Sequence, residues 1–167
     1  WLGSYRTTAV VGQTEDSVER RFVSNRYNRV RRLMRVREDT NTWTYTTANY
    51  RQANASSANQ LAFLAGTTQQ VDATVQAHAS HTLGDSSAYV ASGDGTTWTP
   101  MTNSFVSAND TTLIIRAFTA HAQAYVRPGA STWVWLERST ATGTTTWSGD
   151  AGDATTTQSG IWGWIEN

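Results

Sequence analysis

MRVREDTNTWTYTTANYRQ, which spans residues 34–52, contains two segments in which apolar and polar residues alternate. Met34 and Val36 alternate with arginines, and Trp43 and Tyr45 alternate with threonines. Asp, Thr and Asn at 39–41 separate the two segments, and such short polar side chains favour a reversal of the chain through bonds to the backbone. We therefore predict a β-hairpin with one apolar and one polar face.

The clearest single strand lies at 71–79, where VDATVQAHA alternates strictly and turns a small apolar face inward. Turn signals rich in glycine, asparagine and aspartate separate most of the other candidates. These candidates lie at 61–65, 87–92, 113–118, 120–126, 132–137, 144–147 and 161–166. About eight strands at this spacing predict an all-β sandwich or barrel rather than an α/β fold.

Length and composition exclude several classes of protein. The chain has 167 residues, enough for one large or two small domains, and it has no cysteine for disulfides or thiolate metal sites. Its 13 basic residues, all arginine, balance 13 carboxylates, so net charge predicts no partner. No run reaches the roughly 18 apolar residues of a membrane span, and we expect a soluble chain without membrane insertion. Its start at Trp1 is consistent with a fragment, a processed product or numbering from an internal residue.

A small, polar segment at 52–60 divides two regions of different character. Eight of the arginines lie between Arg20 and Arg37, whereas the second region is poor in charge and contains most of the alternating segments. We therefore expect a small N-terminal hairpin module at 1–55 and a larger β domain at 56–167.

A single long helix is an alternative for the arginine-rich region. Asp16 followed by Glu19 fits a helix N-cap with a glutamate three residues on. Apolar residues at heptad spacing follow: Val23, Tyr27, Val30 and Met34. A coiled-coil stalk at 17–35 and a strand-turn-strand arrangement are both open at this point.

The hairpin and the segment before it resemble small modules of tailed-bacteriophage structural proteins. The shared features are a strand, an Asp-Thr turn, a Trp-x-Tyr strand and a Tyr-Arg exit, preceded by an arm such as RFVSNRYNRVR at 21–31. The Pro- and Gly-rich turn usual in those modules is replaced here by Arg31, Arg32 and Leu33. The resemblance favours strand, turn, strand for the arm.

The order of strands and glycines in 60–167 is similar to the jelly-roll heads of the complement and tumour-necrosis-factor-like type, which phages use at the ends of fibres and spikes. The matching features are AQAYVRPG at 122–129 leading into a strand at 132–138, a glycine-rich loop, and the closing strand SGIWGWI at 159–165. The resemblance implies a jelly-roll β-sandwich after the N-terminal module and a homotrimer. It brings no catalytic residue.

The tryptophans of the second region suggest two uses. Those at 133 and 135, and those at 162 and 164, share a face within each strand, so we expect them to fill a core or a trimer seam. Trp98 and Trp147 have loop-rich surroundings of glycine, threonine and serine. They are therefore our candidates for stacking on a sugar ring at the surface.

Five arginines of the first region are candidates for contacts between molecules: Arg29, Arg31, Arg32, Arg35 and Arg37. Guanidinium groups pair with carboxylates and phosphates. Acidic residues at 15, 16, 19, 38 and 39 lie close in sequence and can neutralise much of this charge. We expect structural or intersubunit pairing, with an anionic partner such as a neighbouring virion protein or lipopolysaccharide as the alternative, and no nucleic acid.

Metal and catalytic sites have little support in the sequence. On a strand, His78 and His81 point to opposite faces, so we assign no metal ligand and no cofactor. Aspartates at 94, 150 and 153 lie in glycine-rich loops, where turn chemistry is commoner than a calcium site. A glycosidase pair such as Asp94 with Asp110 stays open, but nothing singles it out. We expect a non-enzyme.

These expectations describe a structural protein of the extracellular phage particle. The favoured role is a homotrimeric tail fibre or receptor-binding head that contacts host surface polysaccharide and other virion proteins. Two alternatives stay open. One is a capsid decoration protein or head fibre, in which the arginine-rich module would clamp the shell, and the other is a monomeric carbohydrate-binding module.

Overall fold

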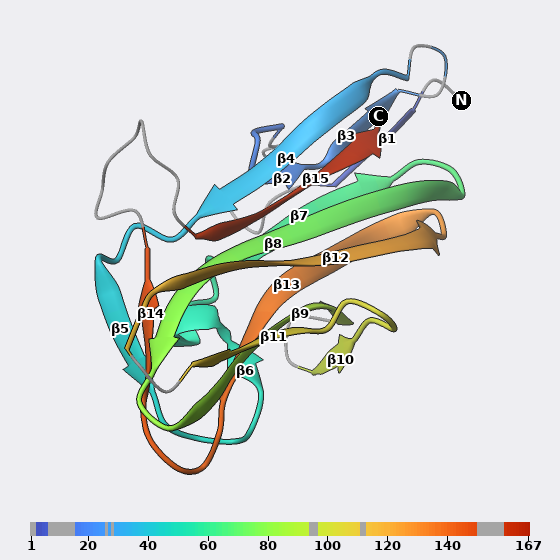
Figure 1. Cartoon of the computed structure of the whole chain (residues 1–167). Coiled ribbons are helices and arrows are strands. Elements are labelled where there is room, and N and C mark those ends of the chain that lie inside the picture. Colours follow the sequence, from blue (N-terminus) through green and yellow to red (C-terminus); the bar gives the residue numbers. More distant parts are fainter. Residues whose placement is uncertain are drawn as a thin grey trace.

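The computed structural model describes residues 3–6, 16–25, 27, 29–93, 97–110, 113–149 and 159–167. Two curled sheets pack face to face as a jelly-roll sandwich, which confirms the all-β prediction (Figure 1). The elements are β1 (Gly3–Tyr5), β2 (Arg20–Arg21), β3 (Val23–Asn25), β4 (Arg31–Arg37), β5 (Thr42–Tyr45), β6 (Arg51–Gln52), the 3₁₀ turn η1 (Ala53–Ala55), β7 (Gln60–Ala65), β8 (Gln69–His81), β9 (Gly84–Gly93), β10 (Trp98–Pro100), β11 (Val106–Asp110), β12 (Arg116–Val126), β13 (Gly129–Ser139), β14 (Thr145–Ser148) and β15 (Gly160–Glu166). Within the described residues, no helix is long and apolar enough to cross a membrane.

The first sheet, which we call sheet I, has β8 at its centre. β12 pairs with one side of β8 over most of its length. On the other side, β14 pairs with residues 78–81 of β8 and β15 with residues 72–76, so β15 and β14 follow one another along the same strand. β5 and β4 form the outer edge, against β14 and β15 respectively.

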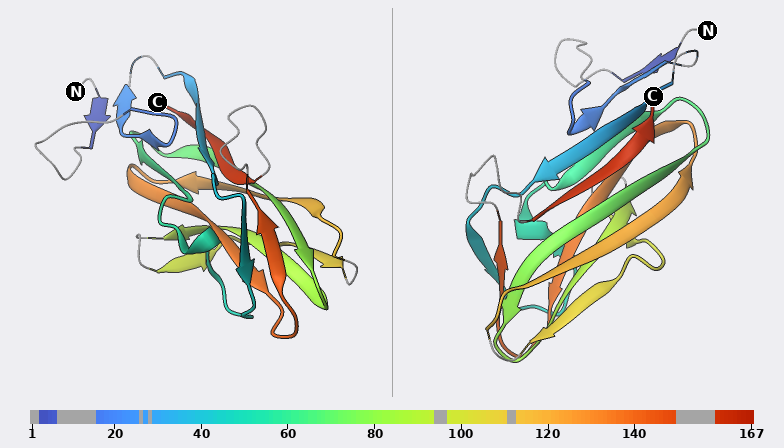
Figure 2. Two further views of the ribbon diagram at one scale, coloured as in Figure 1. Left: turned by 90° about the vertical axis from the view of Figure 1, so that its left-hand side faces the viewer. Right: turned by 45° about the horizontal axis from the view of Figure 1, so that its top comes forward.

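The second sheet, sheet II, is built around the pair β9 and β13. β10 and β11 share the outer side of β9, and β6 and β7 share the outer side of β13. β2 adds to β7 in parallel. A separate ribbon of β1 and β3 lies close to the N-terminus, above the sandwich in Figure 2.

The predicted hairpin at 34–52 is wrong. Both segments are strands, as the alternation predicts, but β4 pairs with β15 and β5 pairs with β14. Residues 38–41 carry the chain onward along the same edge of sheet I. Alternation specifies which face of a strand is buried and leaves its partner open. An edge strand buries Met34, Val36 and Trp43 as a hairpin would.

The expected separation into a module at 1–55 and a domain at 56–167 is also not found. β2, β4, β5 and β6, which all precede residue 56, pair with β7, β15, β14 and β13. Met34, Trp43 and Ala53 belong to the main core cluster. The helix alternative for 17–35 is wrong, because the described part of that segment forms β2, β3 and β4. Both regions therefore build one sandwich.

The strict alternation at 71–79 is confirmed in β8, whose valines and alanines are buried. These small side chains leave room in the core for large rings. The rings of Trp43 and Trp147 stack with centroids 6.4 Å apart. Trp135 meets Trp43 edge-on at 5.8 Å and Trp147 edge-on at 6.0 Å. An alanine-rich strand and a group of indole rings thus complement each other in volume.

Candidate functional site

Trp147 lies in the core, contrary to the prediction of a surface contact. Its side chain is 0% exposed. The segment Thr145–Ser148 forms β14, and its register places Trp147 opposite Ala79 of β8. Phe118 contacts the indole ring edge-on, with centroids 5.8 Å apart. Trp147 therefore stabilises the sandwich and does not reach an external ligand.

Trp98, the other predicted ligand-binding residue, lies at the surface in β10 and is half-buried. It packs against a small cluster made of Ala91, Val134 and Leu136. This cluster lies on the outer face of sheet II, because Val134 and Leu136 alternate along β13 with core tryptophans and Ala91 of β9 is opposite Val134. The indole ring thus lies over an apolar patch outside the core.

A hollow of about 280 Å³ opens beside this ring. We call it the Trp98 hollow, and it is lined by Tyr50, Thr97, Trp98, Pro100 and Leu136. None of these residues carries a charge at neutral pH, and two of them present aromatic rings. The hollow is therefore suited to a ligand with an apolar face.

More aromatic rings continue from the Trp98 hollow. Tyr50 and Tyr89 meet edge-on with centroids 4.6 Å apart, and their hydroxyl oxygens lie 2.6 Å apart. Phe105 lies against Tyr89 at 4.9 Å. Arg138 Nη1 donates to the Tyr50 hydroxyl at 3.3 Å. Burial, together with the hydrogen bond to Tyr50, raises the pKa of Tyr89 to about 12, so its hydroxyl stays neutral and can donate as well as accept.

Two of the five candidate arginines, Arg29 and Arg31, are paired with carboxylates from distant strands. Arg31 Nη2 lies 3.3 Å from Asp72 Oδ2, and its guanidinium lies 4.7 Å from the centroid of the Trp164 ring. Arg29 Nη1 lies 4.0 Å from Glu166 Oε2. The expected structural pairing is present, but neither partner is among the acidic residues close in sequence.

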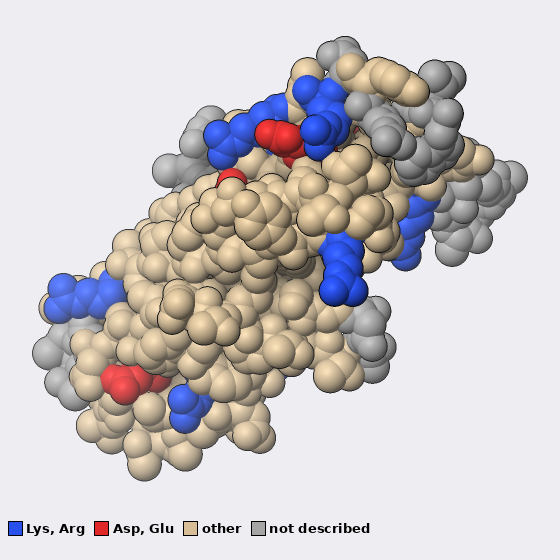
Figure 3. All heavy atoms as spheres, turned by 90° about the vertical axis from the view of Figure 1, so that its right-hand side faces the viewer, with Lys and Arg blue, Asp and Glu red and all other residues tan. Residues whose placement is uncertain are grey.

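The other three candidate arginines divide between the two sides of β4. Arg32 Nη1 donates to Asp16 Oδ2 at 2.8 Å, which is a pairing that sequence proximity predicts. Arg35 is exposed and Arg37 is half-buried, and they alternate with core residues of the strand. On the face drawn in Figure 3, basic and acidic groups lie next to one another at the upper end, and further basic groups lie apart from them.

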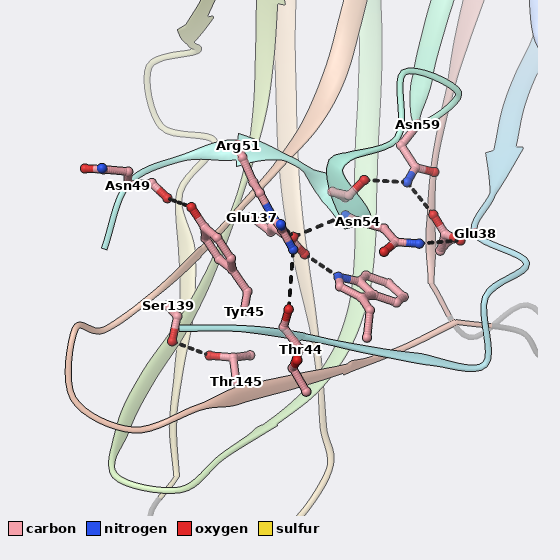
Figure 4. Close-up of polar contacts among 12 residues, drawn as sticks. Glu38, Thr44, Tyr45, Asn49, Arg51, Asn54, Asn59, Glu137, Ser139 and Thr145 are labelled. Carbon is pink, nitrogen blue, oxygen red and sulfur yellow. Dashed lines mark hydrogen bonds and ion pairs between the residues drawn. The ribbon is translucent and has the colours of Figure 1, made fainter. Parts of the chain in front are cut away.

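A buried carboxylate that sequence reasoning missed, Glu137, links β13 to the segment that crosses between the sheets (Figure 4). Its side chain is 0% exposed. Trp43 Nε1 donates to Oε2 at 2.7 Å, Arg51 Nε donates to Oε1 at 2.6 Å, and the Asn54 backbone N–H donates to Oε1 at 3.2 Å. Burial raises the pKa of Glu137, while these N–H donors favour the ionised form. The sequence signal that could have revealed this buried carboxylate is the position of Glu137 directly after the apolar run 133–136.

A second buried carboxylate, Glu38, accepts hydrogen bonds from the Asn59 side chain at 2.5 Å, the Asn54 side chain at 3.2 Å and the Thr40 N–H at 2.9 Å. Burial acts to raise the pKa of Glu38, but the hydrogen bonds outweigh it and lower that pKa. Asn54 touches both carboxylates and has φ 54° and ψ 21°, a left-handed conformation that asparagine tolerates. Glu38 and Glu137 are therefore joined through Asn54, and we call this arrangement the carboxylate clamp.

The predicted separation of His78 and His81 is confirmed, because His81 is 1% exposed on the core side and His78 is on the opposite face of β8. Among the described residues, no three His, Asp or Glu side chains gather to hold a metal ion. Three aspartates of the loop hypotheses, Asp94, Asp150 and Asp153, lie outside the described residues, as does the side chain of Asp110.

Comparisons with known proteins concern the fold alone. No family model matches the chain, and no curated protein matches its sequence. Among solved structures, the chain is similar to one described as the structure of Eiger TNF from S. frugiperda. The TM-score is 0.49 and the sequence identity is 9%, over 83% of this chain and 92% of that chain.

Proposed function

We propose that this chain is a non-enzymatic virion protein of a tailed phage, a tail fibre or receptor-binding head that contacts host surface glycan. The observation that carries the binding function is the Trp98 hollow. Its indole and phenol rings lie over an apolar floor outside the core. Aromatic faces of this kind stack on the apolar face of a sugar ring. The phage setting rests on the resemblance of the strand and glycine order in 60–167 to the jelly-roll heads that phages use, because the hairpin on which the resemblance of 21–52 depended is not found.

The burial and the pairing of four carboxylates support a non-enzymatic role. A general acid or base must lie within hydrogen-bond reach of its substrate. Glu38 and Glu137 are buried and occupied by internal donors. Asp16 and Asp72 are paired with arginines. None of these four groups lines the Trp98 hollow.

Trp98→Ala is expected to weaken glycan binding by about fivefold, because an aromatic contact contributes roughly 1 kcal/mol and 1.4 kcal/mol corresponds to a factor of ten. The measurement is calorimetric titration with a panel of bacterial surface polysaccharides, followed by intrinsic tryptophan fluorescence. Tyr5→Ala is the matched control, because Tyr5 is an aromatic residue that is 71% exposed on the N-terminal ribbon. Equal binding by Trp98→Ala, or no binding to any polysaccharide by the unmodified protein, would contradict the proposal.

We further propose that the head is a homotrimer, as its resemblance to jelly-roll heads implies. Four large apolar side chains are exposed in the connections between the two sheets, at 51–64% exposure. Leu83 lies between β8 and β9, and Leu113, Ile114 and Ile115 come directly before β12. The two connections lie at the same end of the sandwich, because Arg116 pairs with Ala79 near the end of β8. Such a concentration of exposed apolar surface is typical of a protein contact.

Light scattering after size-exclusion chromatography is expected to give three times the 18.3 kDa of one chain. The double variant Ile114→Asp, Ile115→Asp is expected to dissociate, because burying two carboxylates in an apolar contact is costly. Ser57→Asp, on an exposed turn, is the control and should keep the mass of the unmodified protein. A monomer throughout would count against the phage head and favour the carbohydrate-binding module.

A further inference from the structure

A hollow of about 510 Å³ lies on the outer face of sheet I. We call it the Trp164 hollow. β4, β15, β8 and β12 lie side by side here (Figure 1). Trp164 of β15 is opposite Asp72 of β8, which in turn is opposite Gln123 of β12. These three side chains therefore form a row across three neighbouring strands, and all three line the hollow.

Trp164 faces outward and is half-buried, since it alternates along β15 with the core residues Ile161 and Ile165. The guanidinium of Arg31 lies over its ring at 4.7 Å and is held there by the ion pair with Asp72. The hollow therefore combines an aromatic surface with a fixed cation and a fixed carboxylate. Trp164 does not belong to the main core cluster.

Gln69 lines the same hollow and has an unsatisfied donor. Its side chain is 5% exposed. Its Oε1 accepts the Glu166 backbone N–H at 2.9 Å, whereas its Nε2 has no hydrogen-bond partner among the described residues. A buried amide donor without a partner costs about 1–3 kcal/mol. The floor of the hollow is therefore incompletely hydrogen-bonded within the described residues.

The charges around the hollow restrict the chemistry of the ligand. Arg29 and Arg31 donate only, whereas the carboxylates Asp72 and Glu166 accept only, and the side-chain amide of Gln123 does both. The two arginines and the two carboxylates balance and are paired with one another, so the hollow has no net charge that would favour an anion or a cation. Hydroxyl groups can satisfy both kinds of partner at once, because each donates and accepts.

We propose that the Trp164 hollow is a second glycan site that binds a neutral saccharide, distinct from the Trp98 hollow on the other sheet. The proposal rests on the proposed glycan-binding function for the class of ligand, and on different residues for the site. A sugar ring would contact the Trp164 indole while its hydroxyls bond to Gln123 and Asp72. A volume of about 510 Å³ is in the range of small-molecule sites.

The test is saccharide titration, by calorimetry, of the unmodified protein and of Gln123→Ala, Trp164→Ala and Trp98→Ala. The probes are the neutral trisaccharides maltotriose, cellotriose and mannotriose, with trigalacturonic acid as the anionic comparison. We expect Gln123→Ala and Trp164→Ala each to weaken neutral-saccharide binding about tenfold. Gln123 is exposed on the edge strand β12, so its removal keeps the test independent of folding. Thr119→Ala, exposed on the same strand, is the matched control and should bind as the unmodified protein does.

The outcomes separate this inference from the proposed function. Glycan binding that Trp98→Ala removes and that Gln123→Ala and Trp164→Ala leave unchanged would overturn the Trp164 site and retain the proposed function. Trigalacturonic acid bound as tightly as the neutral probes, with the same dependence on Gln123, would overturn the neutral class. A change in oligomeric mass for Trp164→Ala with no change in saccharide binding would identify the hollow as a contact between copies. No binding of any saccharide or surface polysaccharide by the unmodified protein would overturn the proposed function together with this site.

Discussion

Glu137→Ala is expected to lower the free energy of unfolding by about 3–5 kcal/mol, the range for removing one partner of a buried ion pair. The alanine removes the acceptor of three donors: Arg51 Nε–H, the Trp43 indole N–H and the Asn54 backbone N–H. The carboxylate also ties β13 to the crossing segment that contains η1. Its loss should therefore weaken the attachment of that segment to both sheets.

Urea denaturation followed by far-UV circular dichroism measures this effect. Glu137→Gln is a second variant, which retains one side-chain acceptor and should lose less stability than the alanine. Glu166→Ala is the control, because the Glu166 side chain is 57% exposed and its contact with Arg29 is at 4.0 Å. Exposed ion pairs contribute little, about 0–1 kcal/mol. A Glu137→Ala variant as stable as Glu166→Ala would contradict the carboxylate clamp.

Trp147→Ala is expected to cost about 3–5 kcal/mol of unfolding free energy, because it leaves a cavity among tightly packed rings. Trp43 stacks on the Trp147 ring, and Trp135 and Phe118 meet it edge-on, so three neighbours lose contact at once. Trp147→Phe should cost less, since it keeps an aromatic ring and removes an indole N–H that has no partner among the described residues.

Thermal and urea unfolding of Trp147→Ala and Trp98→Ala give a direct comparison of two tryptophans that look alike in sequence. Trp98→Ala should change stability much less, since Trp98 is half-buried and lies outside the main core cluster. Its effect is expected in glycan binding instead. The reverse result, a stable Trp147→Ala and an unfolded Trp98→Ala, would refute the placement of both residues.

Local pattern predicted the strands well where period-two alternation was strong, as in β8, β13 and β15. Local pattern did not predict which strands pair with each other. Residues 34–45 form two strands as predicted, yet they lie end to end along one edge of sheet I and do not fold back on each other. Alternation was weak in β10 and β11, and neither was predicted. The candidates at 113–118 and 120–126 proved to be a single strand that begins at Arg116.

In the candidate site too, sequence patterns predicted some residue positions, whereas strand pairing decided the others. Trp98 was placed correctly at the surface and Trp147 was not, because both have small polar neighbours and only the register of β14 against β8 buries one of them. The pairing of Arg31 with Asp72 joins residues 41 positions apart, which proximity in sequence does not predict. Glu137 was overlooked because its donors come from segments more than 80 residues earlier.

Side-chain type and its alternation were enough to specify an all-β chain, the buried face of its clearest strand and the absence of cysteine chemistry, because these follow from local geometry and composition. The partner of each strand, the single sandwich in place of two modules, the burial of Trp147 and the two hollows were set by three-dimensional packing. Each depends on which distant strands share hydrogen bonds and on the register between them. Adjacent residues carry no information on that choice, since many pairings bury the same apolar faces equally well.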